Sequence, residues 1–129
     1  MAQLHDIVFD CEHPASLARF WAAVLDGYAV APYEEADLDR LRSLGITDIA
    51  DDPTVLVHGP TLPRYFFQQV SETKSVKNRV HLDLSATDPA SEVRRLVSLG
   101  ATVLHRQDAG EHRWVTLADP EGNELCVRG

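Results

Sequence analysis

Cysteine is scarce in this chain, and long apolar runs are missing. Only Cys11 and Cys126 occur among 129 residues, which excludes the disulfide framework of a small secreted domain. No apolar run approaches the roughly 18 residues that cross a bilayer. Asp6 and Asp10 stand where a secretory leader would need an apolar segment. We therefore expect a reduced, cytoplasmic protein with no membrane partner.

Positive charge is also in short supply. The chain has 12 Lys and Arg residues against 20 Asp and Glu residues, for a formal net charge of −8. Nucleic-acid binding needs a basic stripe, and an anionic membrane surface attracts basic segments, so neither partner is expected. The length suits one domain over residues 1–129, and a hydrophobic fraction of 44% is ordinary for a globular protein.

One pattern occurs twice. "DIVFDCEHPASLARFWAAVLDG" and "RVHLDLSATDPASEVRRLVSLG" each run from an alternating segment, through a Pro-Ala-Ser turn, to an amphipathic stretch that ends in glycine. The alternation predicts a half-buried strand, and Pro14 and Pro89 stand at the first position of a helix. Asp88 is a strong helix cap, and Gly27 and Gly100 are expected to end the two helices.

About three further strands are predicted after each helix. They read "YAVAP", "TVLVHG" and "RYFFQQV" in the first half, and "ATVLHRQ", "HRWVTLA" and "NELCVR" in the second. An acidic helix over 34–45 and a turn-rich "DIADDP" loop interrupt the first half. The polar connector 72–78 separates a first module, about 1–71, from a second, about 79–129. Two copies of this length indicate a duplicated module, because a solenoid needs at least about three repeats.

The two opening strands each have an apolar face and a polar face. We expect the apolar faces to lie under the helices and the polar faces to line an open surface. The apolar residues are Ile7, Phe9 and Cys11 in the first strand, and Val80, Leu82 and Leu84 in the second. The polar residues are Asp6 and Asp10 in the first strand, and His81 and Asp83 in the second.

Four phrases, in this order, resemble a known family. "FDCEHPASLARFWAAVLDG", "VKNRVHLDL", "LVSLGATVL" and "LADPEGNELCV" are similar to the glyoxalase-like branch of the vicinal oxygen chelate superfamily. The resemblance implies an α+β fold in which two βαβββ modules form an open, cup-like mixed β-barrel with the helices packed outside. It also implies a small-molecule ligand in the cup and a homodimer.

The resemblance further implies four metal-ligand positions, which fall on Asp6, Gln68, His81 and Cys126. Only His81 matches the usual set of histidine and glutamate. Carboxylate and amide oxygens suit hard cations, whereas a thiolate suits zinc or softer metals. We therefore expect a degenerate site with no cofactor, and leave a divalent metal open. His5 would become a ligand only if a bulge shifted the first strand.

Several of these residues have a functional and a structural interpretation. His81 is either a polar lining residue or part of a proton-transfer pair with Asp10 or Asp83. Cys126 is either a small side chain that packs in the interior or a residue that binds the ligand. Asp6 and Gln68 would also bind the ligand. Trp114, Phe66 and Phe67 either stack on a flat ligand or belong to the core.

The connector also allows two interpretations. Lys74, Lys77 and Arg79 form either a solvated basic edge or a group that steers anions toward the cup. The acidic residues on the polar strand faces instead favour a ligand with hydrogen-bond donors or positive charge.

The sequence thus supports three functions. The first is a glyoxalase-like small-molecule-binding protein with a polar cup. The alternative is a lyase, isomerase or dioxygenase-type enzyme that uses a divalent metal, or His81 with neighbouring acids. The third is a fold kept as an interaction module, because fold alone does not fix function.

Overall fold

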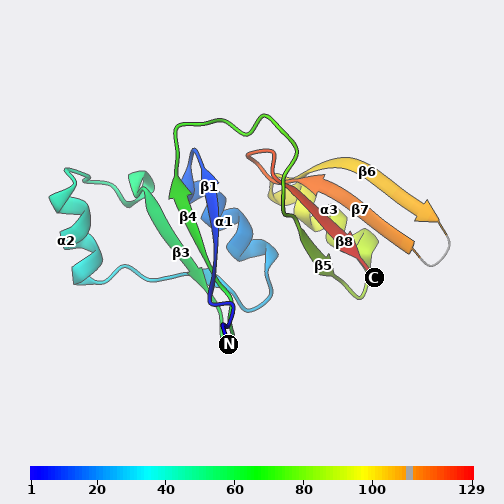
Figure 1. Ribbon diagram of the computed structural model, residues 1–129, viewed down its shortest axis with the longest axis horizontal. Helices are drawn as coiled ribbons and strands as arrows, with labels where there is room; N and C mark the ends of the chain where they lie inside the picture. The colour runs from blue at the N-terminus through cyan, green and yellow to red at the C-terminus, as the bar shows by residue number, and fades with distance from the viewer. Residues whose placement is uncertain (110–111) are drawn as a thin grey trace. The chain divides into compact units, whose positions relative to one another are not determined.

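The computed structural model describes residues 1–109 and 112–129, which form two compact units (Figure 1). The first unit is Met1–Thr73 and the second is Lys74–Gly129. Each unit contains one four-stranded sheet. Within the described ranges, no helix has both the length and the apolar character that a bilayer span requires.

The first unit has a mixed sheet in the order β1-β4-β3-β2. Strands β1 and β4 are parallel, and the other neighbours are antiparallel. Its strands are β1 (Asp6–Cys11), β2 (Ala29–Val30), β3 (Thr54–His58) and β4 (Arg64–Gln69). Its helical elements are α1 (Pro14–Val24), α2 (Glu35–Ser43) and a 3₁₀ turn at Ile49–Asp51.

The second unit repeats this topology. Its sheet has the order β5-β8-β7-β6, again with a parallel first pair and antiparallel neighbours. Its elements are β5 (Leu82–Ser85), α3 (Pro89–Leu99), β6 (Thr102–Ala109), β7 (His112–Ala118) and β8 (Glu124–Arg128). The prediction of an α+β fold with two βαβββ modules is confirmed.

In the first unit, α1 covers one face of the sheet with an aromatic cluster. Trp21 and Phe67 are both buried, and Phe9 lies between them. The ring centroids of Phe9 and Phe67 are 5.1 Å apart in a stacked arrangement, and those of Phe9 and Trp21 are also 5.1 Å apart. Burial of each such side chain stabilises the fold by about 1.5–3 kcal/mol. The apolar face of β1 therefore lies under the helix, as the alternation predicts.

In the second unit, α3 begins and ends at the residues that local signals indicate. The carboxylate of Asp88 accepts a hydrogen bond from the backbone N–H of Ser91 and caps the helix. Gly100 follows the last turn at φ 123°, a conformation that side-chain-bearing residues rarely adopt. Val93 and Leu96 are buried on the face that packs against the sheet.

Two predicted boundaries are wrong. Helix α1 ends at Val24, and Gly27 lies beyond it in the following turn at φ 76°. Val80 does not belong to the apolar face of β5, because it is 78% exposed and the strand begins two residues later. Pairing of β5 with β8 starts at Leu82, since the residues before β8 belong to a turn in which the backbone N–H of Asn123 donates to Asp119.

Helix α2 has few apolar residues and is anchored by a buried carboxylate. The side chain of Asp52 is only 1% exposed and accepts hydrogen bonds from both terminal guanidinium nitrogens of Arg40, at 3.1 and 2.9 Å. The Tyr33 hydroxyl donates to the same carboxylate at 2.7 Å, and the Thr54 backbone N–H at 2.9 Å. Leu41 is the helix's one buried residue. These contacts attach α2 to the start of β3.

Candidate functional site

The second sheet has an open face on the side away from α3. Along β8, Leu125 and Val127 are fully buried, so Cys126 between them points to the opposite face. Cys126 pairs with Asp83 of β5 on one side and with Thr116 of β7 on the other. Strand pairing therefore brings an acid, a thiol and a hydroxyl together on this face.

A pocket of about 420 Å³ lies over this open face. It contains residues from the connector, from the start of β5, and from β7 and β8. They are Lys77, His81, Asp83, Arg113, Trp114, Thr116, Glu124, Cys126, Arg128 and Gly129. Four residues that the sequence proposed, His81, Asp83, Trp114 and Cys126, lie here.

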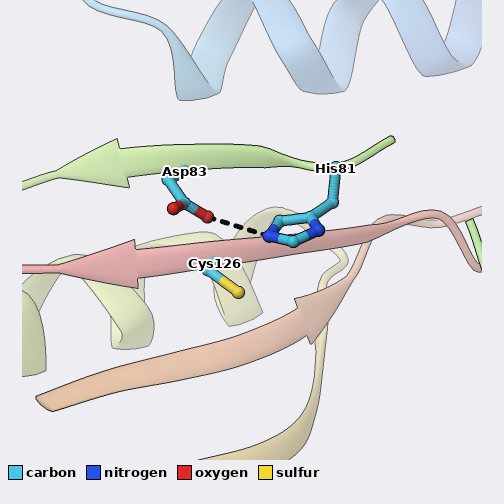
Figure 2. A group of neighbouring side chains, drawn as sticks. All are labelled: His81, Asp83 and Cys126. Atoms are coloured by element: carbon cyan, nitrogen blue, oxygen red, sulfur yellow. Dashed lines mark ion pairs between the residues drawn. The ribbon is translucent and has the colours of Figure 1, made fainter. Parts of the chain in front are cut away.

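His81 and Asp83 form the most direct contact in the pocket. Nε2 of His81 lies 3.1 Å from Oδ1 of Asp83, an ion pair when the imidazole is protonated. Figure 2 shows the two side chains turned toward each other, with Cys126 on the neighbouring strand. Their side chains are 43% and 53% exposed, so a ligand and solvent both have access to them.

Cys126 completes a group of three. One ligand-type atom from each of His81, Asp83 and Cys126 lies within 4.8 Å of the others. Among the described side chains, those of residues 1–108 and 113–129, no second such group of histidine, cysteine and acidic residues is found. The thiol also lies 3.3 Å from the hydroxyl of Thr116, close enough for a hydrogen bond in either direction.

The donor chemistry of this trio suits a zinc-type ion. Imidazole nitrogen, thiolate sulfur and carboxylate oxygen all occur as zinc ligands, and three protein ligands leave one position for water or substrate. Ions such as Mn²⁺ and Mg²⁺ prefer oxygen ligands, which the thiol of Cys126 does not supply. The trio differs from the predicted ligand set, because Asp83 joins it.

The other predicted ligands, Asp6 and Gln68, belong to the first unit. Asp6 is already engaged by Arg64, whose Nε and a terminal nitrogen lie 2.8 and 3.2 Å from the carboxylate oxygens. This guanidinium lowers the pKa of Asp6 below its usual value, with a smaller contribution from the adjacent His5. Gln68 pairs in register with Asp10, and both are exposed. The predicted ligand set is thus divided between two units.

The strand registers also show that Gln68 and Cys126 are not equivalent. Counted from the shared prolines, Val8 corresponds to Asp83. Val8 pairs with Phe66, whereas Asp83 pairs with Cys126. Phe66 is therefore the counterpart of Cys126, and the same count makes Gln68 the counterpart of Arg128.

The sequence reasoning missed several pocket residues. Glu124 and Arg128 alternate in phase with Cys126, so the period of two could have placed them on the same face. Thr116 alternates in phase with Trp114 and could have been found in the same way, whereas Arg113 is out of phase with both of them. Phe67, considered as a stacking residue, is in the core instead.

Most charged groups of the pocket already have partners. Oε2 of Glu124 lies 3.2 Å from Nζ of Lys74, and Nε of Arg113 lies 2.8 Å from Oδ1 of Asp108. Burial on its own raises the pKa of Glu124, but hydrogen bonds from its own backbone and from the Asn78 N–H, together with Lys74, outweigh burial and lower it.

A second pocket, of about 340 Å³, lies in the first unit between α2 and the sheet. It is bordered by Tyr33, Arg40 and Asp52, whose polar groups bond to one another, and by apolar residues such as Leu56 and Phe66. Because its buried carboxylate is satisfied internally, this pocket offers a ligand fewer free polar groups than the first.

The chain matches a family and several solved structures. The sequence model of the glyoxalase-like domain matches residues 6–128. A glyoxalase/bleomycin resistance protein/dioxygenase family enzyme from Burkholderia phytofirmans PsJN is 15% identical, with a TM-score of 0.67 over 98% of this chain and 97% of that one. A search of curated proteins finds no match.

Two fosfomycin resistance proteins, both FosX, also share the fold. The one from Mesorhizobium loti is 11% identical, with a TM-score of 0.67 over 99% of this chain and 91% of that one. A mutant of the one from Listeria monocytogenes, complexed with Mn(II) and a dihydroxypropylphosphonic acid, is 8% identical, with a TM-score of 0.67 over 99% and 89%. At these identities the likeness concerns the fold alone.

Proposed function

The chain belongs to the glyoxalase-like domain family, and from this membership we propose that it binds a small molecule in the pocket of its second module. The observation that supports the proposal most strongly is the convergence of His81, Asp83 and Cys126 at a pocket of about 420 Å³. A concave site with a few convergent polar groups is the usual form of a small-molecule site. No metal is needed for this function.

A ligand screen by thermal shift tests the proposal on three proteins: wild type, His81→Ala and His58→Ala. His58 is the matched control, since it is an exposed histidine at the end of β3 in the other unit. The probes are a panel of small carboxylates, phosphonates, amines and neutral amides. We expect hits on wild type and His58→Ala that disappear in His81→Ala. Hits that survive in His81→Ala and vanish in His58→Ala would indicate a site in the first unit and would contradict the proposal.

A second candidate function is an enzyme of the lyase, isomerase or dioxygenase type. The contact of 3.1 Å between His81 and Asp83 favours it, because a carboxylate that orients an imidazole is a common arrangement for proton transfer. Asp83 would hold the ring through Nε2, and His81 would take or return a proton at its other ring nitrogen, Nδ1. Asp10 remains a proposed catalytic residue. Asp6 and Gln68 remain proposed ligand-binding residues.

A zinc-type ion held by His81, Asp83 and Cys126 would act as a Lewis acid on adjacent substrate oxygens. The Listeria protein was solved with Mn(II), but the thiol here points to a different ion. Metal analysis after purification without added metal separates the candidates. We expect a metal content well below one ion per chain. Stoichiometric zinc that is lost in Cys126→Ser would favour the metalloenzyme instead.

We also propose a cytoplasmic homodimer. Each sheet has one longer edge strand, β1 with six residues and β6 with eight, and unpaired strand edges favour association when they are not covered. The reduced state expected of Cys11 and Cys126 agrees with the cytoplasm.

A further inference from the structure

The unpaired charge of the pocket is positive, although the chain carries a net charge of −8. Both lining side-chain carboxylates have partners: Asp83 contacts His81, which neutralises it when the imidazole is protonated, and Glu124 pairs with Lys74. Of the three lining cations, Arg113 is paired with Asp108. Among the side chains that the structure describes, those of residues 1–108 and 113–129, no carboxylate forms an ion pair with Lys77 or Arg128. Nearby charges outweigh distant ones, since salt screens charges beyond about 8–10 Å.

Arg128 is well placed to meet a ligand. It is the last residue of β8, and its position alternates in phase with Cys126, so it stands on the open face. In the ladder it pairs with Ser85 of β5 and with Trp114 of β7. A guanidinium offers parallel donors that match a carboxylate in a bidentate contact, which a point charge such as Lys77 does not.

Trp114 supplies a flat surface beside this arginine. It lies directly across from Arg128 in the antiparallel ladder, so their Cβ atoms are neighbours on one face. Its side chain lines the pocket and is 38% exposed, whereas the chain's other tryptophan, Trp21, is 1% exposed in the core of the first unit. An exposed indole in a pocket favours planar ligands, which stack on its ring.

We propose that the pocket selects a planar organic carboxylate. The ligand's carboxylate would bind Arg128, its planar part would stack on Trp114, and Lys77 would add attraction from the pocket's edge. This inference rests on the proposed small-molecule function and names its ligand class. It reverses the sequence-based expectation of a cationic ligand, because Asp83, the acid of that set that lines the pocket, contacts His81.

Three matched probes test the inference by calorimetry: naphthoate, its neutral amide, and the corresponding naphthylmethylamine. We expect naphthoate to bind wild type at least tenfold more tightly than the amide. This ratio corresponds to the free energy that one charge-assisted hydrogen bond contributes. Arg128→Gln should remove this advantage and leave amide binding unchanged. Arg106→Gln is the control, since Arg106 is an exposed arginine of the same sheet that pairs with Val115 on the other face.

Tryptophan fluorescence gives a second readout. Because Trp21 is buried in the core, quenching by naphthoate should come from Trp114 and disappear in Trp114→Phe. Trp114→Ala should weaken naphthoate and its amide alike, and should change the binding of cyclohexanecarboxylate less.

The outcomes distinguish a failure of the carboxylate inference from a failure of the proposed small-molecule binding. Tighter binding of the amine than of naphthoate, lost in His81→Ala, would keep the binding function and overturn the carboxylate inference. Equal binding of naphthoate to wild type and Arg128→Gln would also overturn it. Naphthoate binding that depends on Arg128 but not on His81 would support the inference and remove His81 from the site. If no probe binds at millimolar concentration, the carboxylate inference fails, and the thermal-shift panel then decides the binding function by itself.

Discussion

Asp52 shows what a fully buried carboxylate requires of its neighbours. Its two oxygens accept four donors, from the guanidinium of Arg40, the hydroxyl of Tyr33 and the backbone N–H of Thr54. We expect Asp52→Asn to lower the free energy of unfolding by about 1–3 kcal/mol, because hydrogen bonds to a charged group are lost. Asp39→Asn, which breaks the exposed pair with Arg42, should cost no more than about 0.5 kcal/mol. Urea unfolding of both variants measures the difference, and equal costs would contradict the prediction.

The same residue should give stability a pH dependence in acid. Burial alone raises the pKa of Asp52, but the hydrogen bonds from Arg40, Tyr33 and Thr54 outweigh burial and hold it below the usual value. The folded state therefore binds this proton less readily than the unfolded state, whose pKa is about 3.9. The stabilisation is complete above that value and is lost as pH falls through the folded pKa. The stability gap between wild type and Asp52→Asn should thus be constant near neutrality and narrow below about pH 4. A gap that widens in acid would contradict this.

Phe66 and Phe67 are adjacent residues that face opposite sides of one sheet. Phe67 is buried under α1 and stacks on Phe9, whereas Phe66 lies on the open face within 5.2 Å of the Arg64 guanidinium. We expect Phe67→Ala to cost about 3–5 kcal/mol of unfolding free energy, since it leaves a cavity in the core. Phe66→Ala should cost much less. Chemical denaturation of the pair checks this, and similar losses would mean that the open face is packed as tightly as the core.

The end of α3 shows how one residue determines an element boundary. Gly100 has φ 123°, and a Cβ added there would lie 3.3 Å from Cγ of Pro120. Gly45 follows α2 at φ 74°, and a Cβ there would meet nothing within 4 Å. We expect Gly100→Ala to cost about 1–3 kcal/mol and Gly45→Ala less, because only the first combines backbone strain with a close contact. Thermal unfolding of the two variants gives the order, and the reverse order would refute it.

Elements with local signals were predictable, and elements fixed by distant partners were not. Asp88 and Gly100 mark the ends of α3 through contacts within a few residues, so the sequence alone located them. The start of β5 depends on where β8 leaves its turn some forty residues later, which explains the error at Val80. The pairing of Trp114 with Arg128 depends on register in the same way. His81, Asp83 and Cys126 were identified individually, but Asp83 was not expected among the ligand-type residues that group with His81 and Cys126.

At the scale of the whole molecule, the testable property is assembly. We expect sedimentation at tens of micromolar to give about twice the chain mass of 14.3 kDa, because the longer edge strands β1 and β6 offer backbone groups with which a second copy can pair. The control is the same measurement after serial dilution, which should release monomer if the dimer is reversible. A single 14.3 kDa species at every concentration would contradict the homodimer.

The unequal open faces of the two modules have a consequence for protein engineering. A tandem duplication begins with two copies of every reactive position, and here Asp83 and Cys126 of the second copy correspond to Val8 and Phe66 of the first. Packing under the helices constrains both copies, but positions 8 and 66 are free of that constraint. The open face of the first module can therefore accept new side chains without a loss of helix packing. A histidine, acid or thiol introduced at Val8 or Phe66 would create a second reactive centre while the existing one stays intact.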